Sequence, residues 1–186
     1  PADDYTSATT IQDLYDLTIA GGGSYCGSWD LGGVAFDVVD CPDNDDCDNA
    51  EPIACGDALS GSTVNGSLDP TVTTAGIGVW YTFEGTGQDV TFSTCGAADF
   101  DTEITVQTGA DCASLTTLTS NDDFTGCAGN TSELTLYTEF GTTYYIHVGH
   151  WSNSSTTTGT FTLSATFVCP DAADLSAGTL TASSDV

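Results

Sequence analysis

The chain has 186 residues, of which 27 are Asp or Glu and none is Lys or Arg, so that its formal net charge is −27. Because neutralising phosphate requires Lys or Arg, this composition excludes nucleic acids and anionic membrane surfaces as partners. Without these cations, the carboxylates must be solvated, hydrogen-bonded or bound to metal ions.

Short runs in which every second residue is apolar recur along the chain, with the period of half-buried β-strands. An apolar strand is expected first at 34–39. The inward-facing sets that follow are Val79-Tyr81-Phe83, Val90-Phe92, Ile104-Val106, Leu134-Leu136, Tyr144-Ile146-Val148 and Phe161-Leu163-Ala165-Phe167. Clusters of Gly, Asn, Asp and Ser separate them as turns. The pattern predicts an all-β fold, an antiparallel β-sandwich of jelly-roll-like type.

The same Cys-Pro-Asp sequence follows two apolar strands, at residues 41–43 and 169–171. It divides the chain into an N-terminal strand-bearing segment (1–41), a central β-sandwich (42–169) and a C-terminal strand or linker segment (170–186). No apolar run approaches the roughly 20 residues of a membrane span. Because the chain begins at Pro1 without a signal peptide, we expect a mature or processed chain, or a piece of a longer one.

Eight cysteines, an even number without a CxxC pair, predict disulfide bonds and therefore a secreted, extracellular or cell-surface location. Spacing alone leaves many connectivities open. One expected bond closes a short local loop and another links a strand end to an Asn-Asp-Asp turn. The expected pairs are Cys47–Cys55, Cys95–Cys127, Cys26–Cys41 and Cys112–Cys169.

The central segment carries short motifs in a definite order. They are Pro42–Ala50, with the pattern PxNDxxxxA, then Gly78–Phe83, Ala98–Thr102, Asn121–Asp123, Gly141–Val148 and Gly159–Leu163. In this order they resemble the bacterial pre-peptidase C-terminal (PPC) domains, which include the collagen-binding domains of secreted clostridial collagenases. The resemblance covers about two-thirds of the chain. It implies a β-sandwich that serves as a non-catalytic appendage of secreted bacterial proteins.

The acidic turn at the start of the central segment is the first candidate calcium site. Asp43, Asn44 and Asp45 offer carboxylate and amide oxygens within one turn, and these are ligands that Ca²⁺ prefers. The resemblance implies the same role, because Asn44 and Asp45 match the calcium motif of the collagen-binding members and Asp69 loosely matches a downstream ligand. The alternative is that Asp and Asn simply favour turns and caps.

A second candidate calcium site combines two acidic groups. Asp99 and Asp101 precede the predicted strand around Ile104, and Asp122 and Asp123 follow the strand near Leu118. If these strands pair as a hairpin, the two groups meet at one end of the sandwich. Solvated turn residues are the alternative.

The aromatic and histidine residues allow several interpretations. Trp80 has the strand parity opposite to Val79, so that it either packs on the second face of its sheet or contributes to a binding strip. Trp151 lies in a predicted turn, where a binding role is favoured. His147 and His150 are three residues apart on a strand and face opposite sides, so we expect ordinary surface histidines.

The sequence contains no GxSxG elbow, HExxH helix, P-loop or Cys-His pair, which favours a non-catalytic protein. Paired carboxylates leave glycosidase chemistry open. We expect an adhesive or structural subunit, a repeat of a secreted bacterial fibre or surface assembly. Its partners would be copies of itself, joined head to tail by strand exchange, or neighbouring modules. The alternative is an appendage of a secreted hydrolase that binds polysaccharide or fibrous protein.

Overall fold

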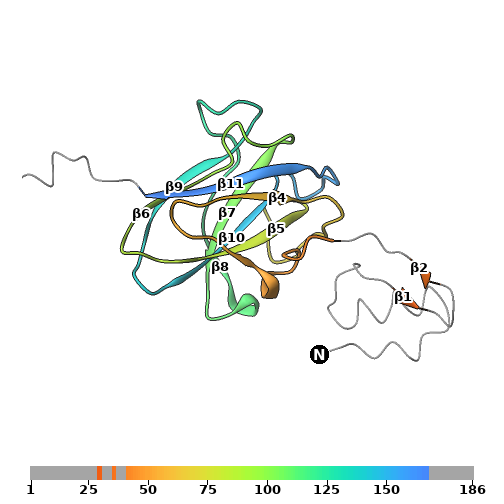
Figure 1. The fold of residues 1–186 in the computed structure, drawn as a ribbon, viewed down its shortest axis with the longest axis horizontal. Coiled ribbons are helices and arrows are strands. Elements are labelled where there is room, and N and C mark those ends of the chain that lie inside the picture. The colour runs from red at the N-terminus through yellow and green to blue at the C-terminus, as the bar shows by residue number, and fades with distance from the viewer. Residues whose placement is uncertain (1–28, 31–34, 37–40, 168–186) are drawn as a thin grey trace, which may run out of the picture.

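The computed structural model describes residues 29–30, 35–36 and 41–167. Strands β1 (Trp29–Asp30) and β2 (Ala35–Phe36) form a short antiparallel pair. The strand expected at 34–39 lies partly, and the C-terminal segment 170–186 wholly, outside the described residues. The remaining strands form two sheets that pack face to face (Figure 1).

One sheet has five strands in the order β3-β5-β10-β7-β8. These are β3 (Glu51–Pro52), β5 (Gly78–Glu84), β7 (Thr102–Thr108), β8 (Thr116–Asn121) and β10 (Thr143–His150). The short β3 runs parallel to β5, and every other pair in the sheet is antiparallel. β7 and β8 pair as an antiparallel hairpin, which is the condition on which the second candidate calcium site depends.

The other sheet has four antiparallel strands in the order β4-β11-β6-β9. These are β4 (Ala58–Ser62), β6 (Gln88–Ser93), β9 (Glu133–Thr138) and β11 (Thr160–Phe167). The chain crosses repeatedly between the two layers, so neighbouring strands within a sheet are mostly distant in sequence. The predicted all-β sandwich is confirmed.

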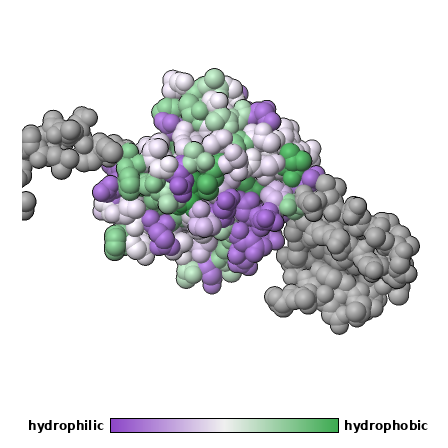
Figure 2. Space-filling view, in the orientation of Figure 1, coloured by the Kyte–Doolittle hydropathy of each residue, from purple (hydrophilic) through white to green (hydrophobic). Residues whose placement is uncertain are grey.

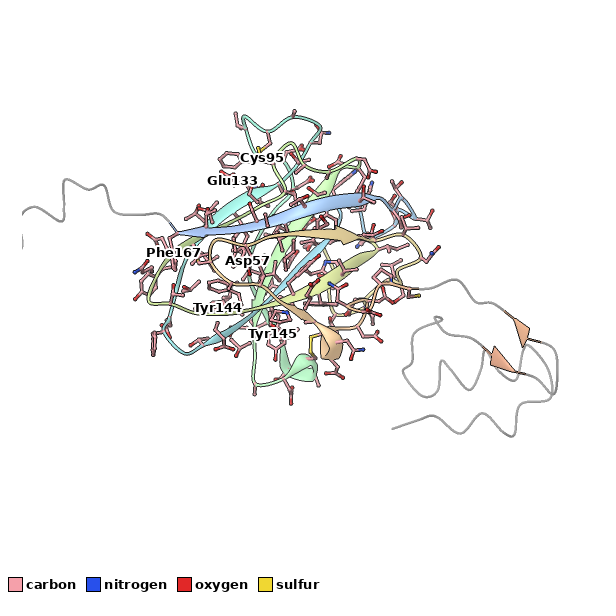
Figure 3. The ribbon with its side chains drawn as sticks, in the orientation of Figure 1. Asp57, Cys95, Glu133, Tyr144, Tyr145 and Phe167 are labelled. Carbon is pink, nitrogen blue, oxygen red and sulfur yellow. A yellow bond between two sulfur atoms is a disulfide. The ribbon has the colours of Figure 1, made fainter. Side chains whose placement is uncertain are left out.

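The core fills the space between the sheets and consists mainly of the apolar sets that the alternation predicts, together with Ile53 and Phe100. Full burial of one large apolar side chain stabilises a fold by roughly 1.5–3 kcal/mol. The largest apolar side chains fully buried between the sheets are Tyr81, Phe83, Phe92, Ile104, Ile146 and Leu163. Phe167, which was expected to face inward, is exposed because β11 ends there at the rim of the sandwich (Figure 3).

Residues 41–50 and 63–76, which we call the cover, lie over the outer face of the five-stranded sheet. The backbone N–H of Trp80 on β5 donates to the carbonyl of Asn44 at 2.8 Å. The Trp80 side chain is fully buried, and the apolar residues that pack with it from the cover are Cys47, Val72 and Ala75. Of the two roles considered for Trp80, packing on the second face is the one that the structure shows.

A disulfide fastens the cover to the sheet. Cys47, in the 3₁₀ turn η2 (Cys47–Asn49), bonds to Cys112, in the turn η3 (Cys112–Ser114) that follows β7. The predicted pairs Cys47–Cys55 and Cys112–Cys169 are therefore wrong. The chain carries Cys47 over the outer face of the five-stranded sheet, whereas Cys55 packs against the core between the sheets and forms no disulfide within the described residues.

The second disulfide joins Cys95, just after β6, to Cys127 in the loop between β8 and β9. This predicted pair is confirmed. The predicted Cys26–Cys41 pair stays a prediction, because Cys26 lies outside the described residues. Within those residues, no helix has the length and apolar character of a membrane span.

His147 on β10 is fully buried and His150, the last residue of β10, is only 7% exposed, so the prediction of both as surface residues is wrong. The face of the sheet that carries His147 is shielded instead of solvated, and the ring of His147 makes an edge contact with Trp80, with centroids 4.9 Å apart. Gly78 leaves room for the ring, because a Cβ there would lie 2.3 Å from Cε1 of His147. Neither ring nitrogen of His147 has a hydrogen-bond partner in the part of the chain that the structure describes, and burial lowers the pKa of His147 to about 4.

Candidate metal site

In the acidic turn of the cover, two predicted calcium ligands, Asn44 and Asp45, form hydrogen bonds with other parts of the chain. The buried Asp45 carboxylate accepts the backbone N–H of Ser67 at 2.7 Å and its hydroxyl at 2.8 Å. The amide of Asn44 donates to the carbonyl of Trp80 at 2.8 Å. These contacts tie the two parts of the cover to each other and to β5.

Asp69 also accepts hydrogen bonds from within the chain. Its Oδ1 accepts the backbone N–H of Thr71 at 2.7 Å, and its Oδ2 accepts the indole N–H of Trp80 at 3.1 Å. Asp43 is exposed, and hydrophilic side chains gather over this part of the molecule (Figure 2). Burial, and then the charges of Asp45, Asp69 and Asp48, raise the pKa of Asp46. Calcium binding at this turn stays a prediction.

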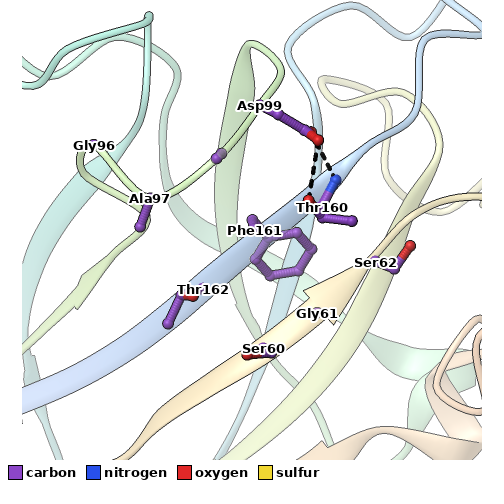
Figure 4. A pocket seen from close by; sticks show the side chains of 10 residues that line it. Ser60, Gly61, Ser62, Gly96, Ala97, Asp99, Thr160, Phe161 and Thr162 are labelled. Atoms are coloured by element: carbon purple, nitrogen blue, oxygen red, sulfur yellow. Dashed lines mark hydrogen bonds between the residues drawn. The ribbon is translucent and has the colours of Figure 1, made fainter.

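Asp99 lies apart from the other acids of the second predicted site. Its Oδ1 accepts the backbone N–H of Thr160 at 2.7 Å, and its Oδ2 accepts the Thr160 hydroxyl at 3.0 Å (Figure 4). The carboxylate thereby anchors the start of β11. It also lines an open pocket of about 600 Å³ between β4, β11 and the loop 96–99.

The remaining three acids of that site do come together, and we call Asp101, Asp122 and Asp123 the acidic cluster. Asp101 immediately precedes β7, and the other two immediately follow β8. The antiparallel register pairs Ile104 with Asn121, so the start of β7 and the end of β8 lie side by side. One carboxylate oxygen from each residue lies within 4.8 Å of the others, a spacing at which the three could share a metal ion.

Two oxygens of the acidic cluster have no partner in the described chain. Oδ1 of Asp101 and Oδ1 of Asp122 are both buried and accept no hydrogen bond. The other oxygen of Asp101 accepts the side-chain amide of Asn130 at 3.3 Å. A buried carboxylate oxygen without a donor is costly, and this chain contains no Lys or Arg that could compensate.

The charges around Asp122 are nearly all negative. Burial raises the pKa of Asp122, the charges of Asp101, Asp123 and Glu103 raise it further, and His150 lowers it. Glu103 on β7 is only 4% exposed, and its Oε1 accepts the hydroxyl of Thr105 at 3.2 Å. The site therefore concentrates negative charge beside a poorly solvated interior.

A divalent cation fits this arrangement. Ca²⁺ is bound by carboxylate and carbonyl oxygens in an irregular geometry, and loops between strands supply such groups. The loop after β8 is itself held firmly, because the buried Ser132 hydroxyl is hydrogen-bonded to the carbonyls of Thr102 and Asp122. The Cys95–Cys127 disulfide crosslinks the same loop.

Cys95, Cys127 and Glu133 form a second close group of metal-binding residue types at this end of the molecule (Figure 3). The two sulfurs are joined in a disulfide. They are therefore not thiolates, the form in which cysteine binds metals. The acidic cluster is the stronger candidate for a metal site.

Sequence reasoning missed Glu103 and His150 as neighbours of the acidic cluster. Strand alternation places Glu103 on the face opposite Ile104, where a charged residue would ordinarily be solvated, but Glu103 is only 4% exposed. The β7–β8 register was the missing information, because it brings the residue before Ile104 close to the residue after Asn121. His150 joins the site because its backbone pairs with Thr102, the residue after Asp101.

Comparisons with known proteins add no family assignment. No protein-family model matches the chain, and no curated protein sequence matches it.

Proposed function

We propose that this chain is a non-catalytic extracellular module, structural or adhesive, that is stabilised by disulfide bonds and by calcium at the acidic cluster. The observation that carries the proposal is the pair of buried, unpartnered carboxylate oxygens on Asp101 and Asp122 in a chain without Lys or Arg. A bound cation would satisfy both oxygens and relieve the mutual repulsion of the acids. Extracellular calcium concentrations suit weak sites of this kind.

Several features support an extracellular location. Two disulfides crosslink the sandwich, and such bonds persist in oxidising compartments. The high negative charge keeps a protein soluble, and divalent cations outside the cell can balance it. The PPC resemblance of the sequence points in the same direction.

Assembly with copies of the same chain is the structural part of the proposal. β8 is an edge strand of its sheet and β4 an edge strand of the other, and no further described strand pairs with the outer edge of either, so each could accept an added strand. A head-to-tail contact of this type generates a filament. Electron microscopy and sedimentation of the full chain should show filaments or ladders, and a strictly monomeric protein would contradict this part.

Calcium is tested on the full chain by titration calorimetry and by thermal unfolding with calcium or with chelator. A cation present at about one hundred times its dissociation constant stabilises the fold by about 2.7 kcal/mol. For a domain of this size we expect chelation to lower Tm by roughly 5–10 °C.

The matched variants are Asp122→Asn, which removes a ligand of the acidic cluster, and Asp48→Asn, which removes an exposed acid of the cover. Asp122→Asn should abolish the calcium-dependent shift in Tm, and Asp48→Asn should preserve it. A wild-type Tm that is the same in calcium and in chelator, without heat of binding, would overturn the calcium proposal.

A further inference from the structure

Among the cysteines that the structure describes, Cys55 alone forms no disulfide bond. It lies half-buried in the turn 54–57 and packs against the core between the sheets. Burial, and then the charge of Asp57, raise the pKa of its thiol. Because reactive and metal-binding cysteines need a lowered pKa, the surroundings of Cys55 are those of a structural cysteine.

The turn that carries Cys55 is attached to the last part of β11. The backbone N–H of Gly56 donates to the carbonyl of Ala165 at 2.7 Å, and the backbone N–H of Ala165 donates to the carbonyl of Asp57 at 3.1 Å. β11 ends two residues later at Phe167, whose side chain is exposed at this rim of the sandwich (Figure 3). The described chain therefore ends close to Cys55.

Cys169 comes two residues after Phe167 and lies outside the described residues. Two residues of chain span at most about 7 Å, which limits how far Cys169 can be from the end of β11. In the sequence, Cys169 has the same parity as the inward-facing residues of β11, which begin at Phe161. Its position in the chain therefore favours the core side, where Cys55 packs.

Cys41 lies at the other end of β11 and is already disulfide-bonded. Its Sγ is 2.9 Å from the carbonyl oxygen of Asn65, which comes three residues after the end of β4. The last residue of β4, Ser62, pairs with Thr160, the first residue of β11. Cys41 and Cys55 are therefore near opposite ends of the same strand.

This separation decides between the two cysteines outside the described residues, Cys26 and Cys169. β11 rises roughly 23 Å from its first residue to its last. The two-residue reach beyond β11 and the Cα separation of a disulfide together cover at most about 14 Å. Cys169 therefore cannot bond to Cys41 while β11 is formed. This leaves Cys26 for Cys41, and Cys169 for Cys55.

We propose that Cys55 and Cys169 form a disulfide bond within the chain, which fastens the end of β11 to the turn between β3 and β4. The two thiols lose two protons and two electrons in this step. A disulfide of the oxidising compartment, on a small molecule or on an oxidoreductase, accepts them and becomes two thiols. The exchange passes through a mixed disulfide on one cysteine, which the thiolate of the other then attacks.

A bond at this position limits how copies of the chain can exchange strands. It fixes β11 to the rim of its own sandwich, so β11 cannot be donated to another copy. Only the residues after Cys169 are left to pair with an edge strand of a neighbour. The bond depends neither on calcium at the acidic cluster nor on assembly, so each of the three is tested separately.

The test is peptide mapping without reduction of the full chain, produced in an oxidising compartment and treated with N-ethylmaleimide to block free thiols. Cleavage by Asp-N together with chymotrypsin releases Cys55 in the peptide 48–56 and Cys169 in the peptide 168–170, each without another cysteine. We expect these two peptides to be joined by a disulfide and to carry no maleimide. Maleimide on Cys55, or a bond from Cys55 to Cys26, overturns the proposal.

Thermal unfolding of alanine variants gives a second, independent readout. Cys169→Ala should lower Tm by about 10 °C, because the bond closes a long loop. Cys55→Ala and the double variant should have about the same Tm as each other, because either change removes the same bond. A Cys169→Ala variant with the wild-type Tm would contradict the bond. On non-reducing electrophoresis the wild type should migrate as a monomer, and a covalent dimer or ladder joined through these cysteines would overturn a bond within one chain.

Discussion

The cover and the acidic cluster both contain aspartates, but their carboxylates differ in how fully they are hydrogen-bonded. In the cover, Asp45 and Asp69 accept hydrogen bonds from backbone and side-chain donors of the chain itself. In the acidic cluster, one oxygen of Asp101 and one of Asp122 are buried and accept no hydrogen bond from the described residues. We therefore expect a cation at an acidic motif where the fold leaves carboxylate oxygens without hydrogen-bond donors.

The largest expected effect concerns the disulfides that hold these two regions. Cys47–Cys112 spans 65 residues and Cys95–Cys127 spans 32. Loop-closure entropy predicts that replacing either pair by alanine lowers the free energy of unfolding by about 4 kcal/mol, slightly more for the longer loop. Denaturant unfolding of the two double variants measures this.

Calcium affinity distinguishes the two disulfide variants. Loss of Cys95–Cys127 loosens the loop that follows Asp123 and should weaken calcium binding. Loss of Cys47–Cys112 frees the cover and should leave calcium affinity unchanged. Equal losses of calcium affinity in the two variants would show that the cover and the acidic cluster are coupled, and would contradict the expected difference between them.

His147 provides the next largest effect, as a pH dependence. Its pKa is about 4 in the folded protein against an ordinary value of 6.5, so the unfolded chain binds the proton more tightly. The contribution of the neutral, buried His147 to the free energy of unfolding is complete above pH 6.5. It falls by about 3 kcal/mol as the pH drops to 4. The charge of Asp69 in the cover acts in the opposite direction and limits the shift.

The measurement compares the unfolding free energy of wild type and His147→Gln between pH 4 and 7. Carboxylates titrate in both proteins, so the difference between the two curves isolates the histidine. We expect the variant to have the flatter profile over this range. Parallel curves would mean that His147 is accessible to water and that the cover does not seal it.

The smallest effects have opposite signs in the two acidic regions. Asp45→Asn weakens charge-assisted hydrogen bonds to Ser67 and should cost about 2 kcal/mol of unfolding free energy. In calcium-free buffer, Asp122→Asn should instead stabilise the protein, because it removes repulsion from Asp101, Asp123 and Glu103. Solvent screening keeps that gain below about 1 kcal/mol. Destabilisation by Asp122→Asn without calcium would contradict the difference between the two regions.

The alternation of apolar and polar residues was sufficient to predict the β-sandwich and most residues on the inner faces of its sheets. It identified Tyr81, Ile104 and Leu163 as core residues because alternation is a local property of strands. The hairpin that brings Asp101 near Asp122 was an open condition of that pattern, and it forms between two strands that are consecutive in the chain.

The cover could not be predicted in this way. Its contacts with β5 join Asn44 to Trp80 across 36 residues, and no local pattern signals which outer face becomes buried. The error for His147 and the incorrect pairing of Cys47 have this single cause. Both residues lie at the interface between the cover and the sheet, which forms through contacts between segments that are distant in sequence.

The Cys47–Cys112 bond also governs how the sandwich would respond to a pulling force. Tension that enters at the N-terminal side of the cover passes through the sulfur bridge to the segment just after β7, a strand flanked on both sides by others. The 65 residues between the bridged cysteines would be shielded from extension, which removes roughly 230 Å of contour length that an unbridged chain could release. A tether made from such units would be short and stiff, with little capacity to lengthen under load.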